Sequence, residues 1–133
     1  MYGASIGLKA QNTTQLILRI KKGLPLNTFE QLCKNLALPE KELGRILKIP
    51  PSTLARRKKS GHLSFEESER VFRIARLYDK AVEVFQQPEL GCKWLKEPAW
   101  ALGDAAPLVY ADTELGAKEV EDLLGRIEHG VFT

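Results

Sequence analysis

The chain has 133 residues, 44% of them hydrophobic, and a formal net charge of +3. These values are ordinary for one soluble globular domain or two very small ones. No apolar run approaches the length that spans a membrane, and Leu16-Ile17-Leu18 is too short for a signal peptide and lacks a cationic segment before it. The expected location is therefore the cytoplasm.

The charge is divided unequally along the chain. Residues 1–65 contain twelve Lys and Arg against three acids, a balance of +9, whereas the remainder has eight against fourteen, a balance of −6. A basic half favours binding to a polyanion, and an acidic half is kept off DNA and left for a protein partner.

The N-terminal part predicts an arm and two short helices. Residues 1–15 are expected to form a mobile arm, because the segment up to Asn12 has no sustained hydrophobic period. Helices are expected to begin at Thr13 or Thr14 and at Asn27 or Thr28, which are suitable caps. The second helix has one apolar face, which comprises Phe29, Leu32 and Leu36.

Residues 40–61 have the pattern of a helix-turn-helix. Apolar residues at three- and four-residue spacing predict a first helix from about Glu40 to Leu47. Pro50 cannot continue that helix, whereas Pro51 suits the first position of a second one, so residues 48–50 form the turn. In this motif the second helix enters the DNA major groove with its early residues facing base edges.

The second helix of this motif carries the expected DNA-binding residues. Thr53 and either Arg56 or Arg57 are expected to contact base edges, since Arg makes a bidentate contact with guanine. Lysines are expected to contact phosphates. The alternative is a solvated cationic helix end that suits the helix dipole. The complete expected set is Lys48, Ser52, Thr53, Arg56, Arg57, Lys58 and Lys59.

A capping box formed by Ser64 and Glu67 predicts the start of a long helix that runs to about Gln86. Its apolar stripe is wide, which is explained either by core packing or by contact with a second copy of the chain. Gln87-Pro88 ends the helix and marks the expected boundary between a helix-turn-helix domain, residues 16–86, and a second domain, residues 87–133.

The C-terminal part predicts a short helix before Pro98 and a final helix capped by Asp112 or Thr113 and stopped at Gly130. Beyond that stop, Phe132 is expected either to anchor in a partner's pocket or to fold back on a tryptophan of this chain. No strand pattern is present, so the fold class is all-α, a helix-turn-helix bundle followed by a small α-helical domain.

No site for chemistry is evident. The two cysteines, Cys33 and Cys92, and the two histidines, His62 and His129, are isolated, which argues against metal binding and a disulfide framework. No nucleophile set or phosphate-binding glycine loop is found, so an enzyme is the least expected class and no cofactor is predicted.

Several segments in order resemble the Xre/MbcA/ParS-type antitoxins that partner RES-domain toxins. In the first half they are residues 23–25, 53–57, 61–64 and 67–73. In the second half they are Trp94-Leu95, Pro98, Ala101-Leu102-Gly103, Pro107, residues 113–116 and the run from Val120 to Phe132. The segment Asp104-Ala105-Ala106 departs from the family pattern.

The resemblance implies an antitoxin that neutralises an NAD-degrading toxin encoded beside it and represses their shared promoter at an operator with an inverted repeat. It also implies a homodimer within a larger toxin–antitoxin complex, in which any NAD⁺ belongs to the toxin. The last helix and tail would cover the toxin's NAD⁺-binding cleft. The toxin-binding residues carried over by position are Arg126, Glu128, His129, Val131 and Phe132.

Two alternatives remain open. One is an Xre-type transcriptional repressor without a toxin partner, which the presence or absence of a toxin gene next door would distinguish. The other is an interaction module whose helix-turn-helix no longer binds DNA, against which the charge of the basic half argues.

Overall fold

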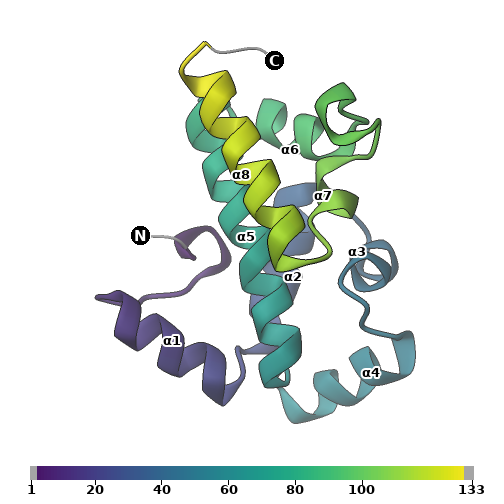
Figure 1. The fold of residues 1–133 in the computed structure, drawn as a ribbon. Coiled ribbons are helices and arrows are strands. Elements are labelled where there is room, and N and C mark those ends of the chain that lie inside the picture. Colours follow the sequence, from purple (N-terminus) through teal and green to yellow (C-terminus); the bar gives the residue numbers. More distant parts are fainter. Residues whose placement is uncertain (1–2, 131–133) are drawn as a thin grey trace. The chain divides into compact units, whose positions relative to one another are not determined.

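The computed structural model describes residues 3–130, which contain eight α-helices, two 3-10 helices and no β-strand (Figure 1). The prediction of an all-α fold is confirmed. None of the described helices is both long and apolar enough to cross a membrane. The helices are η1 (Ala4–Ile6), α1 (Thr13–Lys22), α2 (Leu26–Leu36), α3 (Glu40–Ile46), α4 (Pro51–Ser60), α5 (Phe65–Phe85), α6 (Pro88–Lys96), η2 (Trp100–Leu102), α7 (Pro107–Tyr110) and α8 (Glu114–Glu128).

The chain forms two compact units that divide inside α5, between Ala75 and Arg76. This division lies earlier in the chain than the boundary expected at Gln87-Pro88, because α5 continues from the first unit into the second as a single helix.

The N-terminal segment has more structure than the arm expected for residues 1–15. Residues 4–6 form the turn η1, in which Ile6 is buried, and Leu8 is buried after it. The side-chain amide of Asn35, on α2, donates to the carbonyl of Ser5 at 2.9 Å. The expectation is corrected here, because two apolar side chains in a polar segment are sufficient to pack it onto a neighbouring helix.

Both predicted N-terminal caps are displaced by a residue or two. The side chain of Asn12, and not Thr13 or Thr14, accepts from the backbone N–H of Gln15 at 2.9 Å. The helix α2 begins at Leu26, with Pro25 in the cap position and no side-chain cap. Its first turn is fixed instead by a tertiary bond, in which the N–H of Leu26 donates to Gly61 at 2.9 Å.

The helix-turn-helix is confirmed as α3, a turn and α4. Pro51 occupies the first turn of α4, as predicted. Lys48 takes the left-handed conformation in the turn, with φ of 60°. Ile49 is buried beside it, and its N–H donates to the carbonyl of Gly44 at 2.8 Å. The turn is therefore fixed by a buried apolar side chain and a backbone bond without a glycine at the left-handed position.

The core of the first unit is built from the inward faces of its helices. Its fully buried large side chains include Phe29, Leu32, Leu36, Leu43, Ile74 and Val71. The buried hydroxyl of Ser68, on α5, accepts from the N–H of Leu24 at 2.7 Å and donates to Ser64 at 2.6 Å. This hydroxyl ties the connection before α2 to the start of α5.

The second unit contains the later part of α5 together with α6, η2, α7 and α8. Thr113 caps α8 by accepting from the N–H of Gly116 at 3.0 Å, which confirms one of the two predicted caps. The rings of Phe85 and Trp94 are 5.9 Å apart. The buried side chains of this unit include Leu77, Ala81, Leu95, Leu108, Val120 and Leu124.

Gly23 lies in the connection before α2, and Leu63 lies in the connection after α4. Gly23 provides a test of the packing between these two connections. Its φ is +94°, and a Cβ placed there would lie 2.2 Å from the carbonyl oxygen of Leu63. Gly23→Ala is expected to lower the free energy of unfolding by more than about 2 kcal/mol, because it adds a clash with backbone to left-handed strain. Urea denaturation measures this loss. The matched control is Gly7→Ala, with φ of +84° and no atom within 4 Å, for which a loss of about 1 kcal/mol is expected. Equal losses in the two variants would contradict the close approach at Gly23.

Candidate functional site

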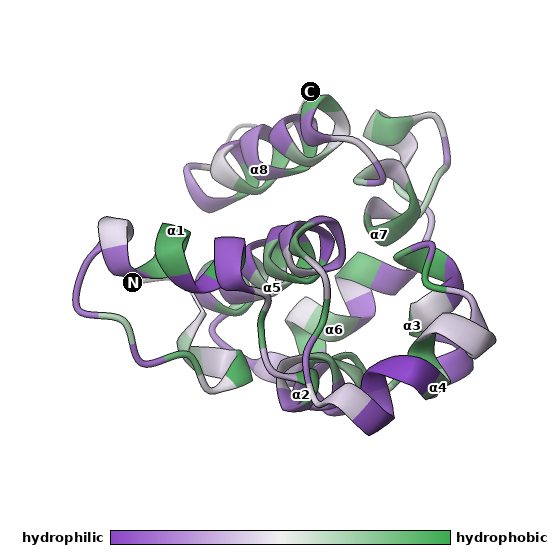
Figure 2. Cartoon of the chain, turned by 90° about the horizontal axis from the view of Figure 1, so that it is seen from below, coloured by the Kyte–Doolittle hydropathy of each residue, from purple (hydrophilic) through white to green (hydrophobic). Residues whose placement is uncertain are grey.

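The helix α4 presents a polar face to solvent, and Figure 2 shows most of it as hydrophilic. Leu54 alone is buried, and it holds the helix on the core of the first unit. Ser52, Arg56 and Lys59 follow at spacings of four and three residues, so they share one face of the helix, and all three are exposed. Within residues 3–130 neither Arg56 nor Lys59 forms an ion pair, although Arg56 donates to the hydroxyl of Thr53 at 3.3 Å.

Arg57 is held differently from its neighbours. Its Nε and Nη2 donate to the two carboxylate oxygens of Glu67 at 2.7 and 3.1 Å, and Glu67 is only 5% exposed. The same carboxylate accepts from the backbone N–H of Ser64 at 2.8 Å, as the capping box predicts. Of the two arginines expected at base edges, Arg56 extends into solvent and Arg57 joins α4 to the start of α5.

The pKa of Glu67 follows from this environment. Burial disfavours the carboxylate and by itself raises the pKa, but the hydrogen bonds from Arg57 and Ser64 outweigh that effect and hold the pKa below its ordinary value. The pKa of Arg57 is raised, chiefly by its hydrogen bond with Glu67. Both groups are therefore charged at neutral pH.

The last cations of α4 are divided between an ion pair and solvent. The ammonium of Lys58 lies 2.7 Å from the carboxylate of Glu40 on α3, and both side chains are partly exposed. Such a pair contributes little to stability and is easily exchanged for another anion. Lys58 thus remains close to the exposed face of α4 and available for another anion.

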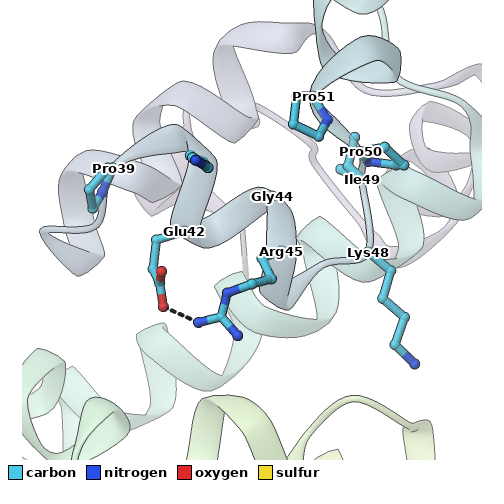
Figure 3. A pocket seen from close by; sticks show the side chains of 9 residues that line it. Pro39, Glu42, Gly44, Arg45, Lys48, Ile49, Pro50 and Pro51 are labelled. Carbon is cyan, nitrogen blue, oxygen red and sulfur yellow. Dashed lines mark hydrogen bonds and ion pairs between the residues drawn. The ribbon is translucent and has the colours of Figure 1, made fainter.

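A groove of about 600 Å³ lies in front of the helix-turn-helix turn (Figure 3). Its apolar lining includes Pro39, Ile49, Pro50 and Pro51, and three cations, Lys41, Arg45 and Lys48, stand around it. Glu42 pairs with Arg45 one turn away, and Lys48 points away from the groove (Figure 3).

Two of these three cations were not among the DNA-binding residues predicted from the sequence. Lys41 and Arg45 are exposed and four residues apart on α3, and Lys48 follows three residues later. In a helix-turn-helix the first helix crosses the DNA backbone, which makes these positions suitable for phosphate contacts. The spacing of cations at four and three residues along residues 41–48 was a signal available in the sequence.

The end of α8 carries the second set of expected site residues. Arg126 is half-buried, and its Nε is buried without a hydrogen-bond partner among the described residues. Glu128 pairs with Lys80 at 3.1 Å, and His129 is exposed at the C-terminal cap of the helix. Val131 and Phe132 lie outside the described residues.

Ion pairs fix α8 against the later part of α5. Arg76 lies 2.6 Å from Glu121 and 3.1 Å from Glu114, and Lys80 lies further along the same helix opposite Glu128. Burial opposes the charge on Arg76, but its two carboxylate partners raise its pKa above the ordinary value. Three acids on one side of α8 are thereby paired with two cations of α5, which fixes the orientation of α8 on that helix.

The two cysteines are buried and not joined in a disulfide. Burial is the largest cause that raises the pKa of Cys33 to about 11, so its thiol is neutral at physiological pH. Within residues 3–130 no three His, Cys, Asp or Glu side chains are grouped so as to hold a metal ion.

The two units correspond to two protein-family models. Residues 15–76 match the antitoxin Xre-like helix-turn-helix domain. Residues 80–130 match the antitoxin Xre/MbcA/ParS C-terminal toxin-binding domain. The architecture is thus that of a two-domain antitoxin.

Three similar proteins align with most of this chain. An antitoxin Xre of Yersinia enterocolitica is 38% identical over 130 residues, which cover 96% of this chain and 88% of that protein. An antitoxin Xre of Photorhabdus laumondii is 30% identical over 97% of this chain and 88% of its own. A protein of a Sphingobium species named Prs ADP-ribosylating antitoxin is 28% identical over 85% and 77%. The chain belongs to the Xre antitoxin family.

Glu67→Gln tests the joint between α4 and α5. The substitution removes a charge that accepts three hydrogen bonds, and we expect it to lower the free energy of unfolding by about 1–3 kcal/mol at pH 7. Because the pKa in the folded protein is depressed, the stabilisation is complete above the ordinary carboxyl value of 4.5 and is lost as the pH falls through the folded pKa.

The measurement is chemical denaturation of both proteins between pH 3 and pH 7, where the difference should shrink toward the acid end. Glu69→Gln is the matched control, because Glu69 is on the same helix and is exposed. The ion pair would be shown not to stabilise the fold if the loss of unfolding free energy did not change with pH. The same conclusion would follow if the control variant showed an equal loss.

Proposed function

We propose that this chain is the antitoxin of a toxin–antitoxin pair that neutralises a cognate NAD-degrading RES-domain toxin by covering its active site. It also binds operator DNA and thereby autoregulates the operon as a repressor. The observation that carries the proposal is the presence, in order, of an Xre-like helix-turn-helix domain and a toxin-binding domain in one chain. One relative is named for ADP-ribosylation, a reaction that usually takes the ADP-ribosyl group from NAD⁺. That name supports the proposal of a toxin that uses NAD⁺.

Toxin inhibition is assigned to the end of α8 and the residues after it. Arg126 and His129 offer a cation and a hydrogen-bonding ring, which suit sites made for the phosphates and riboses of a dinucleotide. Arg126 is half-buried in the last turn of α8, and His129 is exposed at its C-terminal cap. Glu128, Val131 and Phe132 complete the proposed contact, with Phe132 in an apolar slot.

DNA recognition is assigned to the exposed face of α4. Arg56 makes the bidentate contact with guanine, and Ser52 and Thr53 contact neighbouring base edges. Phosphates are contacted by Lys48, Lys58 and Lys59, to which the groove adds Lys41 and Arg45. Arg57 acts through its pair with Glu67, which sets the position of α4.

The chain acts as a homodimer that reads an inverted repeat with half-sites about one helical turn apart. Its place of action is the cytoplasm, where operator DNA and NAD⁺ are both present. If no toxin gene adjoined this one, the function would reduce to that of an Xre-type transcriptional repressor without a toxin partner.

The division of roles between the two arginines is tested by comparing Arg56→Ala with Arg57→Ala. We expect Arg56→Ala to weaken operator binding by at least tenfold with an unchanged melting temperature, because it removes a base contact worth about 1–3 kcal/mol. Arg57→Ala should lower the melting temperature, because it leaves the buried Glu67 carboxylate without its cation.

Fluorescence anisotropy on operator DNA and thermal unfolding measure the two effects at near-physiological salt. Operator binding by the double variant, Arg56→Ala with Arg57→Ala, serves as a further check. Operator binding that survives both substitutions would mean that α4 is not the recognition helix.

The tail is tested by co-expressing the neighbouring gene product with the full chain, a chain ending at Gly130 and a chain ending at Gly125. Growth and cellular NAD⁺ should be restored by the full chain and not by the chain ending at Gly125, which lacks every proposed toxin contact. The chain ending at Gly130 keeps the pair of Glu128 with Lys80, so its failure would assign inhibition to the last three residues.

Operator binding by each truncated protein is the control for folding. Equal rescue by all three chains would place the toxin contact elsewhere. If the product of the neighbouring gene is not toxic, the repressor function alone would remain.

A further inference from the structure

The C-terminal ends of α1 and α4 meet within the first unit. The N–H of Leu63, after α4, donates to the carbonyl of Leu24, after α1, at 2.9 Å. The N–H of Leu26 donates to the carbonyl of Gly61, also at 2.9 Å. In Figure 1 the two helices approach the start of α5 from opposite sides. The last turns of α1 and α4 are therefore held close to one another by backbone hydrogen bonds.

Three exposed lysines lie beside this contact. Lys21 and Lys22 are the last two residues of α1 and directly precede Gly23. Lys59 is in the last turn of α4, two residues before Gly61. All three are exposed, and none of them forms an ion pair with another residue of the described range 3–130. Lys21, Lys22 and Lys59 are together called the basic corner.

Few acids are available to balance the charge of the basic corner. Residues 1–29 contain four cations and no Asp or Glu, and residues 43–65 contain six cations and none. The other two cations in the last turn of α4 are already paired, with Glu40 and Glu67. Glu66, in the first turn of α5, is exposed and forms no ion pair with these lysines.

Helix dipoles account for part of this charge. Each helix C-terminus carries about half a negative charge, so the two ends that meet here contribute about one. Three lysines exceed that by about two positive charges. The backbone bonds hold these like charges together, and an anionic partner would relieve their repulsion.

Duplex DNA is the polyanion that this position favours, because the basic corner adjoins the helix assigned to the operator. Lys59 lies on the same exposed face of α4 as Ser52 and Arg56. The ten residues of α1 extend about 15 Å at 1.5 Å per residue, which is the length of about four base pairs at 3.4 Å each. The cations of α1 thus add to the cationic surface of α4 on the scale of a few phosphates.

We propose that the basic corner is a second phosphate-binding site for operator DNA, in which Lys21 and Lys22 of α1 act from outside the helix-turn-helix motif. The inference rests on the proposed binding of DNA by α4. Phosphate contacts carry no sequence information but fix the register of a protein on the duplex. The basic corner therefore supplies affinity and register, whereas Arg56 supplies the preference for the operator.

The experiment compares the full-length chain with the double variant Lys21→Gln/Lys22→Gln. Fluorescence anisotropy measures the affinity of each for a duplex from the promoter of its own gene and for an unrelated duplex, over a range of salt concentrations. Neutralising one phosphate releases about 0.9 counterion, so the slope of log affinity against log salt should become shallower by about 2 per half-site. Affinity for the two duplexes should fall by the same factor, whereas Arg56→Ala should reduce the preference for the promoter duplex.

Lys34→Gln is the matched control for the loss of a charge. Lys34 is an exposed lysine in the last turn of α2, eight residues and about 12 Å of helix from Leu26, so its substitution should leave the salt slope unchanged. Lys21→Arg/Lys22→Arg retains both charges and should retain the slope. The melting temperature of every variant should equal that of the unaltered chain.

An unchanged salt slope in the double glutamine variant would overturn the proposal while leaving recognition by α4 intact. If that variant also had a lower melting temperature, the lysines would be assigned to the helix dipoles alone. A slope that Lys34→Gln changed as much per charge would show a general effect of net charge and would equally overturn the proposal.

A membrane surface is tested with vesicles of phosphatidylcholine and phosphatidylglycerol. Vesicle binding that the double glutamine variant lost, with an unchanged salt slope on DNA, would assign the basic corner to lipid and overturn the proposal. If the unaltered chain did not bind the promoter duplex at all, the proposed binding of operator DNA would itself fail, and this inference with it.

Discussion

The carboxylate of Glu67 is the interaction on which the arrangement of the first unit depends. It is nearly inaccessible to solvent, and it simultaneously completes the capping box of α5 and receives both arms of the Arg57 guanidinium from α4. Burial of an ion pair does not by itself guarantee stability. Here the carboxylate accepts three hydrogen bonds, which oppose the cost of desolvation, and one side chain joins two helices.

This constraint explains why the two adjacent arginines of α4 have different surroundings. Successive residues on a helix are rotated by 100°, so only one of the two can turn toward α5 while the other remains on the outer face. Leu54 fixes the inner face, and Arg57, three residues later, lies on the same side. Arg56 is consequently left for solvent, together with Ser52 and Lys59.

Local patterns in the sequence were sufficient for the all-α class and for several of the motifs that bound the helices. The capping box at Ser64, Pro51 in the first turn of α4 and the cap at Thr113 are all determined by residues within four positions of one another. The pairing of Arg57 with Glu67 was not predicted, because a helix end and ten residues of chain separate the two. The packing of residues 3–8 onto α2 was also missed, since its partner Asn35 is thirty residues away. Tertiary contacts of this kind leave no periodic signal in a single sequence.

The opposite charges of the two halves give a physical reason why one small chain can serve both partners. Phosphate attracts the exposed cations of α4, whereas residues 66–133, with fourteen acids against eight cations, repel it. Charge therefore favours DNA at the basic half and disfavours it at the acidic half, where residues 80–130 match a toxin-binding domain.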